Sequence, residues 1–168
     1  MGKIIDLVVQ FFEKENWQFS TLKDESSIQT SFTSDQGTWM CLAQTVEDDV
    51  NQRFYFYSIC PIKAQDNLTI VAEFITRVNY GLSIGNFELD FSDGEIRFKT
   101  SVDITEDGFG LATVERLVYT NVLMMDRYLP GLISVLAGQV KPIEAIQLIE
   151  VEPEEAVPEP TSSDHFLR

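Results

Sequence analysis

The stretch GNFELDFSDGEIRFKTSVDI, residues 85–104, is the most informative part of the sequence about the fold. Apolar and polar residues alternate on both sides of Asp93-Gly94. An Asp-Gly pair in this setting is the strongest short-range signal for a β-hairpin with a two-residue type I′ turn. Such a turn predicts the cross-strand pairs Phe91–Ile96, Asp90–Arg97, Leu89–Phe98 and Glu88–Lys99. Because the carboxylates would then face cations, we interpret the stretch as a hairpin and not as an acidic catalytic site.

The rest of the chain carries the apolar patterns of an α+β protein. Helical spacing predicts three amphipathic helices, over 3–15, 69–80 and 113–128. Strand-like patterns predict three strands, over 27–34, 38–46 and 53–62. With the hairpin before the last helix, the order is α-β-β-β-α-β-β-α. Since the strands are clustered, we expect an antiparallel sheet flanked by helices.

Capping residues predict where the helices begin and end. Thr69 and Thr113 are placed as N-caps, and Gly81 as a left-handed residue after the second helix. Pro130 predicts the start of a separate short helix, and Pro142 that of another.

The composition divides the chain into one domain and a tail. Residues 1–148 have the hydrophobic periodicity of a single domain, whereas residues 149–168 are rich in proline and glutamate without periodicity. We expect the tail to be disordered. His165, the one histidine, lies in it and is therefore not expected to take part in catalysis.

Two of the predicted strands are apolar on both faces. In 53–62, Phe54 and Phe56 alternate with Tyr55 and Tyr57, and in 38–46 Trp39 is followed by Met40. Apolar residues on both faces indicate that both faces are covered. The protein's own helices would cover one face. The other face is either internal core as well or a surface for a partner. The candidate interaction residues of such a surface are Trp39, Phe54, Tyr55, Phe56 and Tyr57, although only one face of the strand can serve.

The charge balance limits the class of partner. Twelve basic and 27 acidic residues give a net charge of −15, which disfavours nucleic acid and anionic membranes. A protein or peptide partner is the better expectation, although acidity also simply keeps proteins soluble. No export signal or membrane span is legible, and Cys41 and Cys60 lack metal-site spacing, so we expect two reduced cysteines in a cytoplasmic protein.

Few residues are candidates for chemistry. The segment Asp103–Gly108 partly resembles a calcium-binding loop but lacks the final bidentate carboxylate, because Val114 stands at that position. No catalytic, cofactor-binding or metal-binding residue is predicted. Asn121 lies on an apolar helix face and is interpreted first as a core amide. The alternative is a ligand pocket formed near Asn79, Tyr80 and Asn121.

Three phrases of the sequence resemble the YbjN family of bacterial proteins, which are described as sensory-transduction regulators. They are FYFYSICPIKA (54–64), AEFITRVNYGLSIGNFELDFSDGEIRFKT (72–100) and LVYTNVLMMDRYLPG (117–131). The resemblance extends over most of Met1 to about Gln147 and leaves out the tail. It implies a fold similar to that of type III secretion chaperones, which are small, acidic, often homodimeric proteins that bind extended stretches of their partners. It implies no catalytic residues and no cofactor.

Three hypotheses about function follow. The first is a non-enzymatic, dimeric protein-binding module, similar to a chaperone or an adaptor. The second is a ligand-sensing regulatory domain that uses the pocket near Asn79. The third and weakest is an enzyme with carboxylates as acid and base, for which the sequence shows no isolated acidic pair outside the hairpin and the tail.

Overall fold

The computed structural model describes residues 3–104 and 108–150 of the chain. They form one six-stranded antiparallel sheet with the order β1-β2-β3-β4-β6-β5. The elements in chain order are α1 (Lys3–Lys14), β1 (Phe19–Thr21), β2 (Ser27–Ser34), β3 (Gly37–Glu47), β4 (Gln52–Ile59), α2 (Leu68–Gly81), β5 (Asn86–Leu89), β6 (Ile96–Asp103), α3 (Leu111–Leu136) and α4 (Pro142–Glu150). The predicted α+β class and element order are confirmed; α4 begins at Pro142, where a short helix was predicted, and β1 is an addition.

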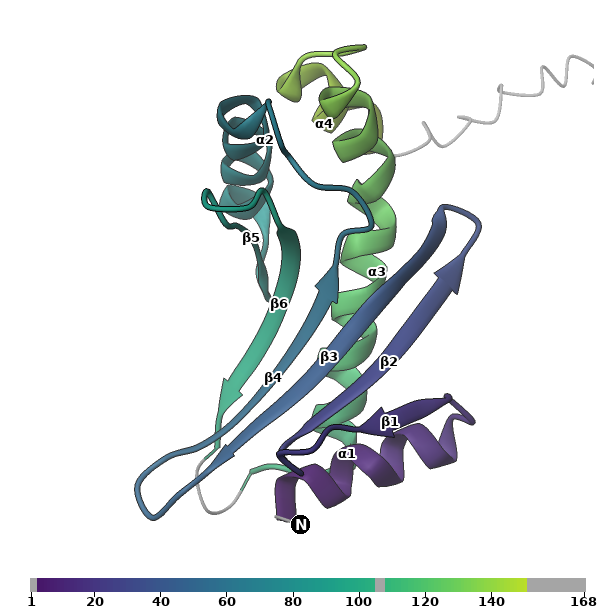
Figure 1. Cartoon of the computed structure of the whole chain (residues 1–168), viewed down its shortest axis with the longest axis vertical. Helices are drawn as coiled ribbons and strands as arrows, with labels where there is room; N and C mark the ends of the chain where they lie inside the picture. The colour runs from purple at the N-terminus through teal and green to yellow at the C-terminus, as the bar shows by residue number, and fades with distance from the viewer. Residues whose placement is uncertain (1–2, 105–107, 151–168) are drawn as a thin grey trace, which may run out of the picture.

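The helices cover one face of the sheet. Helix α3 runs behind β3 and β4, α1 lies across one end, and α2 and α4 lie together at the other (Figure 1). The side chains that point toward the helices are almost completely buried, and Phe54, Phe56 and Phe98 among them are 0% exposed. No helix or strand among the described residues covers the opposite face, which we call the open face.

Helix α1 shows how the apolar pattern becomes core. Its Ile5, Val8, Phe11 and Phe12 are at most 1% exposed, because their spacing places them on one side of the helix. The Phe12 ring packs against Phe56 of β4, 6.4 Å away between centroids, and thereby fixes the helix on the sheet. Burial of these four side chains contributes about 8 kcal/mol before the loss of conformational entropy is subtracted.

Helix α3 continues through Pro130, where a new helix was predicted to begin. A proline inside a helix costs about 3 kcal/mol because it lacks the amide hydrogen and crowds the preceding turn. The buried stripe nevertheless continues from Leu129, just before the proline, to Leu132 and Val135 beyond it, all at most 1% exposed. The packing of that last part of the helix offsets the cost of the proline, so the prediction of two helices was wrong.

The helix ends also differ from those predicted. Helix α2 begins at Leu68 and α3 at Leu111, so Thr69 and Thr113 lie inside the first turns and are not N-caps. Gly81 belongs to α2 and lacks the left-handed conformation. The tail from 151 onward and the central residues of the predicted calcium loop, 105–107, lie outside the described residues. None of the helices in the described ranges combines the length and apolarity that crossing a bilayer requires.

The hairpin of 85–104 is present, but its register differs from the prediction. Leu89 pairs with Ile96 and Glu88 with Arg97, so the loop is two residues longer than a type I′ turn. Phe91 therefore stands in the loop and is 62% exposed. Two local hydrogen bonds favour the longer loop: the carboxylates of Asp90 and Asp93 accept the amides two residues ahead of them, in the manner of Asx turns.

Candidate protein-binding surface

The open face consists of the outward side chains of β3, β4, β5 and β6. Strand pairing places Leu42 opposite Tyr57, and Tyr57 opposite Lys99. Across the sheet in this direction, the apolar side chains of β3 and β4 form a centre, and the charged side chains of β6 and β5 form its margin. Met40 and Val46 are 45% and 39% exposed at the two ends of the apolar centre. The face is formed by Met40, Leu42, Gln44, Val46, Arg53, Tyr55, Tyr57, Ile59, Glu88, Glu95, Arg97, Lys99, Ser101 and Asp103.

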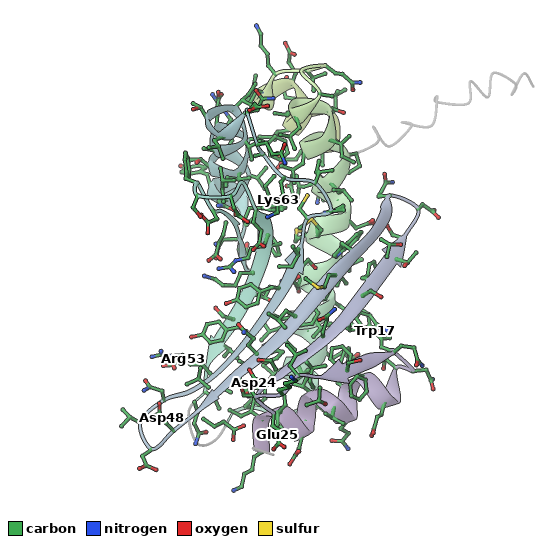
Figure 2. The ribbon with its side chains drawn as sticks, in the orientation of Figure 1. Trp17, Asp24, Glu25, Asp48, Arg53 and Lys63 are labelled. Carbon is green, nitrogen blue, oxygen red and sulfur yellow. The ribbon has the colours of Figure 1, made fainter. Side chains whose placement is uncertain are left out.

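Two tyrosines and two arginines form a ladder on this face. The rings of Tyr55 and Tyr57 are nearly parallel, with 6.3 Å between centroids and 9° between planes. The Arg97 guanidinium lies 4.6 Å from the Tyr57 centroid, close enough for a cation–π interaction. Arg53 lies two residues before Tyr55 on the same side of β4 and forms the other end of the ladder. Figure 2 labels it at the lower end of the sheet. This ladder places flat aromatic surface between two fixed positive charges.

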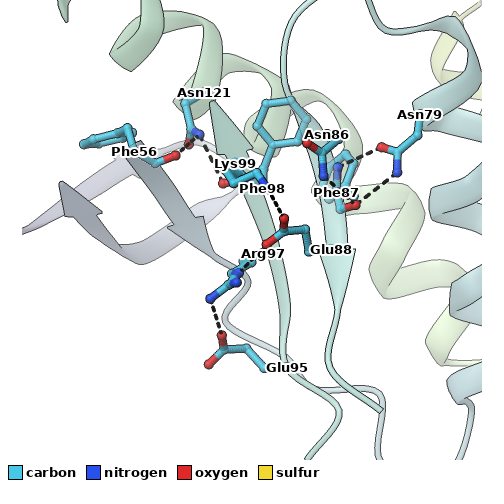
Figure 3. A network of polar contacts seen from close by, with 10 residues as sticks. All are labelled: Phe56, Asn79, Asn86, Phe87, Glu88, Glu95, Arg97, Phe98, Lys99 and Asn121. Atoms are coloured by element: carbon cyan, nitrogen blue, oxygen red, sulfur yellow. Dashed lines mark hydrogen bonds and ion pairs between the residues drawn. The ribbon is translucent and has the colours of Figure 1, made fainter. Parts of the chain in front are cut away.

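The charged margin is held by one carboxylate. Glu88 accepts hydrogen bonds from Arg97 Nε (2.7 Å) and from Lys99 Nζ (Figure 3). Partial burial opposes the ionisation of Glu88, but the hydrogen bonds and charges of Lys99 and Arg97 outweigh it and lower the pKa of this carboxyl group. Glu88 thus joins both cations, whereas the sequence predicted only the pair with Lys99.

The two edges of the sheet differ. On α2, the Asn79 amide donates to the carbonyl oxygen of Phe87 (3.0 Å) and accepts its backbone N–H (2.7 Å), so it occupies both outward backbone groups at this point of β5 (Figure 3). At the other edge, β1 pairs only with Ile28–Thr30 of β2. In the described part of the chain no strand pairs with Ser31–Ser34 on that side. A peptide could extend the sheet there.

A shallow hollow of about 550 Å³ lies beside this free edge. Ser20, Gln29, Ser31 and Met40 are among its lining residues, so it joins the edge to the apolar centre of the open face. The two features form one continuous surface.

The sequence-predicted interaction residues separate into two sets. Trp39, Phe54 and Phe56 point toward the helices and are at most 2% exposed, and Trp39 donates its indole hydrogen to Ser58 Oγ (3.0 Å). As core residues they leave no surface for a partner. Tyr55 and Tyr57 lie on the open face. The sequence selected whole strands because periodicity does not say which face a helix covers.

The predicted pocket residues do not meet in one cavity. Asn79 braces β5, Tyr80 is 96% exposed, and Asn121 is completely buried beneath the sheet. The Asn121 amide donates to the carbonyl oxygens of Phe56 (2.8 Å) and Phe98 (3.1 Å), on β4 and β6. These contacts support the interpretation as a core amide.

The sequence reasoning missed Met40, Leu42, Arg97 and Lys99 as members of the surface. Their signal was present in the strand alternation: Leu42 and Lys99 pair with Tyr57, and Met40 and Arg97 lie two residues from them on the same sides of β3 and β6. It became readable only once the order β3-β4-β6 was known.

Comparisons with known proteins identify the family and the fold of this chain. The sequence model of the YbjN family, described as "Putative bacterial sensory transduction regulator", matches residues 5–134. The chain belongs to the YbjN family. This match includes most of α1, all six strands, α2 and α3 up to its last turn. No curated protein matches the chain.

Two solved structures have the same fold as this YbjN-family chain. One, "Crystal Structure of the ExsC-ExsE Complex", is 11% identical, covers 77% of this chain and 96% of that chain, and has a TM-score of 0.53. The other, "Crystal structure of YbjN, a putative transcription regulator from E. coli", is 10% identical, covers 74% of this chain and 92% of its own, and has a TM-score of 0.50. At such identities the likeness shows the fold alone, and that fold is the chaperone-like one expected from the sequence.

Proposed function

We propose that this YbjN-family protein is a non-enzymatic protein-binding module, similar to a chaperone or adaptor, that binds its partner on the open face and the adjoining β2 edge. The observation that carries the proposal is an aromatic sheet face that no helix of the described chain covers. A similar fold in the ExsC-ExsE complex supports it, because that structure contains two different proteins together.

The charge distribution agrees with this role. The open face holds three cations and three carboxylates, whereas the other described residues hold eight cations and seventeen carboxylates. A neutral, partly apolar region on an acidic protein is the part of its surface that loses least solvation when a protein partner covers it.

Site-specific photo-crosslinking tests the proposal. A benzoylphenylalanine at Met40 or Val46 on the open face should give a discrete crosslinked partner in a native lysate, and the same group at Tyr80 on α2 should not. Tyr80 is a stringent control because it is more exposed than either test position. Equal crosslinking at all three positions, or none at any, would contradict the proposed surface.

Two further properties belong to the proposal. We expect a homodimer, which light scattering would show as about twice the 19.1 kDa of one chain. We also expect a cytoplasmic protein, and the two free cysteines in the structure support a reducing compartment.

A further inference from the structure

A second hollow lies among α2, α3 and α4, which pack together at the end of the sheet away from α1 (Figure 1). Its volume of about 520 Å³ is typical of sites for small molecules. One wall comes from α3, on which Thr120, Met124 and Arg127 follow one another at helical spacing and therefore share a face. The segment between α2 and β5 forms another wall, and Glu150, the last residue of α4, lines the hollow as well.

The hollow offers apolar side chains to a ligand. Ile84 is 44% exposed, and Leu82 and Met124 of the same hollow are partly exposed. Apolar side chains on a concave surface lose contact with water when an apolar group enters, which favours binding. The thioether of Met124 is flexible and adapts to aliphatic groups of different shape. These residues indicate a ligand with an aliphatic part.

Two opposite charges line the same hollow without neutralising each other. In the described part of the chain, the Arg127 guanidinium has no carboxylate oxygen within 4.0 Å. Glu150 Oε1 accepts a hydrogen bond from the Tyr128 hydroxyl (2.8 Å). Because Tyr128 is only 3% exposed, this bond gives the carboxylate a fixed position, and no group of the described residues donates to its other oxygen.

This combination is complementary to a small zwitterion. A carboxylate can form a bidentate pair with the Arg127 guanidinium, and an ammonium group can donate to the Glu150 carboxylate. A ligand with a negative charge alone, such as a fatty acid, would face Glu150 and is opposed by the net charge of −15. A zwitterion has no net charge and therefore does not meet this repulsion.

We propose that this hollow binds an apolar α-amino acid. Its carboxylate pairs with Arg127, its ammonium group with Glu150, and its side chain packs against Ile84 and Met124. An α-amino acid carries both charged groups on one carbon, so one small molecule satisfies both residues at once. The inference goes beyond the proposed function, because the hollow shares no lining residue with the open face.

Titration of the isotope-labelled full-length protein with L-leucine, followed by two-dimensional NMR, tests the inference. We expect saturable shifts of the backbone amides of Leu82, Ile84 and Met124, and unchanged amides of Tyr55 and Tyr57 on the open face. Two analogues separate the contributions of the charges: 4-methylpentanoate lacks the ammonium group, and 3-methylbutylamine lacks the carboxylate. Each should bind about ten- to hundredfold more weakly than leucine, because a charged hydrogen bond is lost.

Three variants assign the charges to residues. Arg127→Gln and Glu150→Gln should each weaken leucine binding by about ten- to hundredfold, whereas Arg116→Gln should leave it unchanged. Arg116 is the matched control because it is exposed on the same helix and does not line the hollow. All three side chains are exposed, so the variants should keep the folded state of the wild type.

Other outcomes would overturn the inference. Absence of saturable shifts, or shifts spread evenly over the surface, would mean that the hollow is not a binding site. An analogue that binds as tightly as leucine, or a charge variant that behaves like Arg116→Gln, would contradict the recognition of a zwitterion. If leucine fails to bind while Met40 crosslinks a partner, the inference fails and the proposed function stands.

Discussion

At the scale of single residues, Asn121 shows how one polar side chain joins two layers. It is 0% exposed, and its amide nitrogen reaches carbonyl oxygens of two neighbouring strands and the Thr100 hydroxyl (3.3 Å). Thr100 in turn donates to the Leu117 carbonyl oxygen of α3 (3.0 Å). These bonds fix the position of the helix along the sheet, which apolar packing alone specifies poorly.

We therefore predict that Asn121→Ala lowers the free energy of unfolding by about 2 kcal/mol, through lost hydrogen bonds and a cavity. Asn121→Asp should cost more, because a carboxylate cannot donate to the carbonyl oxygens and would be buried as a charge. Urea denaturation measures both. Leu123→Ala, on the same helix at a position 52% exposed, is the control, and an equal loss there would contradict the role of Asn121.

Glu88 gives a prediction about pH. Its pKa is lower in the folded protein than its ordinary value of 4.5, so its contribution to stability is complete above pH 4.5 and is lost as the pH falls through the folded pKa. Glu88→Gln should cost about 1 kcal/mol at pH 7, a typical value for a partly exposed ion-pair network, and the difference from wild type should shrink below pH 4.5. Denaturation curves over this range check it.

The matched control for Glu88 is Glu95→Gln. Glu95 lies on the same face, but its nearest cation atom is Arg97 Nη1 at 3.9 Å, without a hydrogen bond in the described part of the chain. Its replacement should change stability little. A cost equal to that of Glu88→Gln would indicate a general charge effect instead of the specific bonds.

At the scale of elements, the hairpin shows what local sequence can and cannot predict. Alternation predicted the two strands and the face of each side chain within β5 and β6, since the true register differs by an even number of residues, whereas Phe91 stands in the loop. The predicted loop was too short because, besides the local bonds of Asp90 and Asp93, a contact distant in sequence stabilises the longer loop: the Gly94 carbonyl oxygen accepts the Ala64 amide (2.9 Å), from the segment between β4 and α2.

Replacement by alanine should have opposite effects on stability at two glycines, Gly94 in this contact and Gly81 at the end of α2. Gly94 has φ +75°, and a Cβ there would lie 2.9 Å from the Ala64 backbone, so Gly94→Ala should lower the free energy of unfolding by about 2 kcal/mol. Gly81→Ala at the end of α2 meets nothing within 4 Å and should stabilise by up to about 1 kcal/mol through helix propensity. Thermal unfolding of both variants checks the prediction. A loss at Gly81 would restore the left-handed role predicted from the sequence.

The prediction for helix α3 was wrong for a different reason: the local rule that proline ends a helix was applied, and tertiary packing overrides it here. Proline chemistry predicted a break at Pro130, but Leu132 and Val135 after it continue the buried stripe of the residues before it. The periodicity was visible in the sequence. What the sequence could not show is that α2 and α4 would both pack on this end of the helix and compensate the lost bond.

At the scale of the whole molecule, the sequence predicted the layers but not which surface remains open. Periodicity gave the fold class and element order, because these depend on each segment separately. The identity of the open face depends on strand order and on where α1 and α3 cross the sheet, and both are set by contacts between distant segments. The candidate residues of β4 therefore came from both faces of the strand, and of these Tyr55 and Tyr57 lie on the open face.

The burial of the two cysteines predicts their chemistry. Burial raises the pKa of the Cys41 thiol to about 12 and that of Cys60 to about 11, so both remain protonated and unreactive at neutral pH. Ellman's reagent should modify neither in the native protein and both after denaturation. Val50→Cys, at a hairpin tip that is 88% exposed, should react at once. Fast modification of Cys41 in the native state would mean that the sheet and helices separate readily.

The brace of Asn79 on β5 limits how this protein can assemble. The outward N–H and carbonyl oxygen of Phe87 are already bonded from within, so a strand added beside β5 would have to break both bonds. Ser31–Ser34 of β2 face no such competition from a strand in the described part of the chain. Strand addition is therefore directed to one margin of the sheet, which opposes growth from both sides of the same molecule.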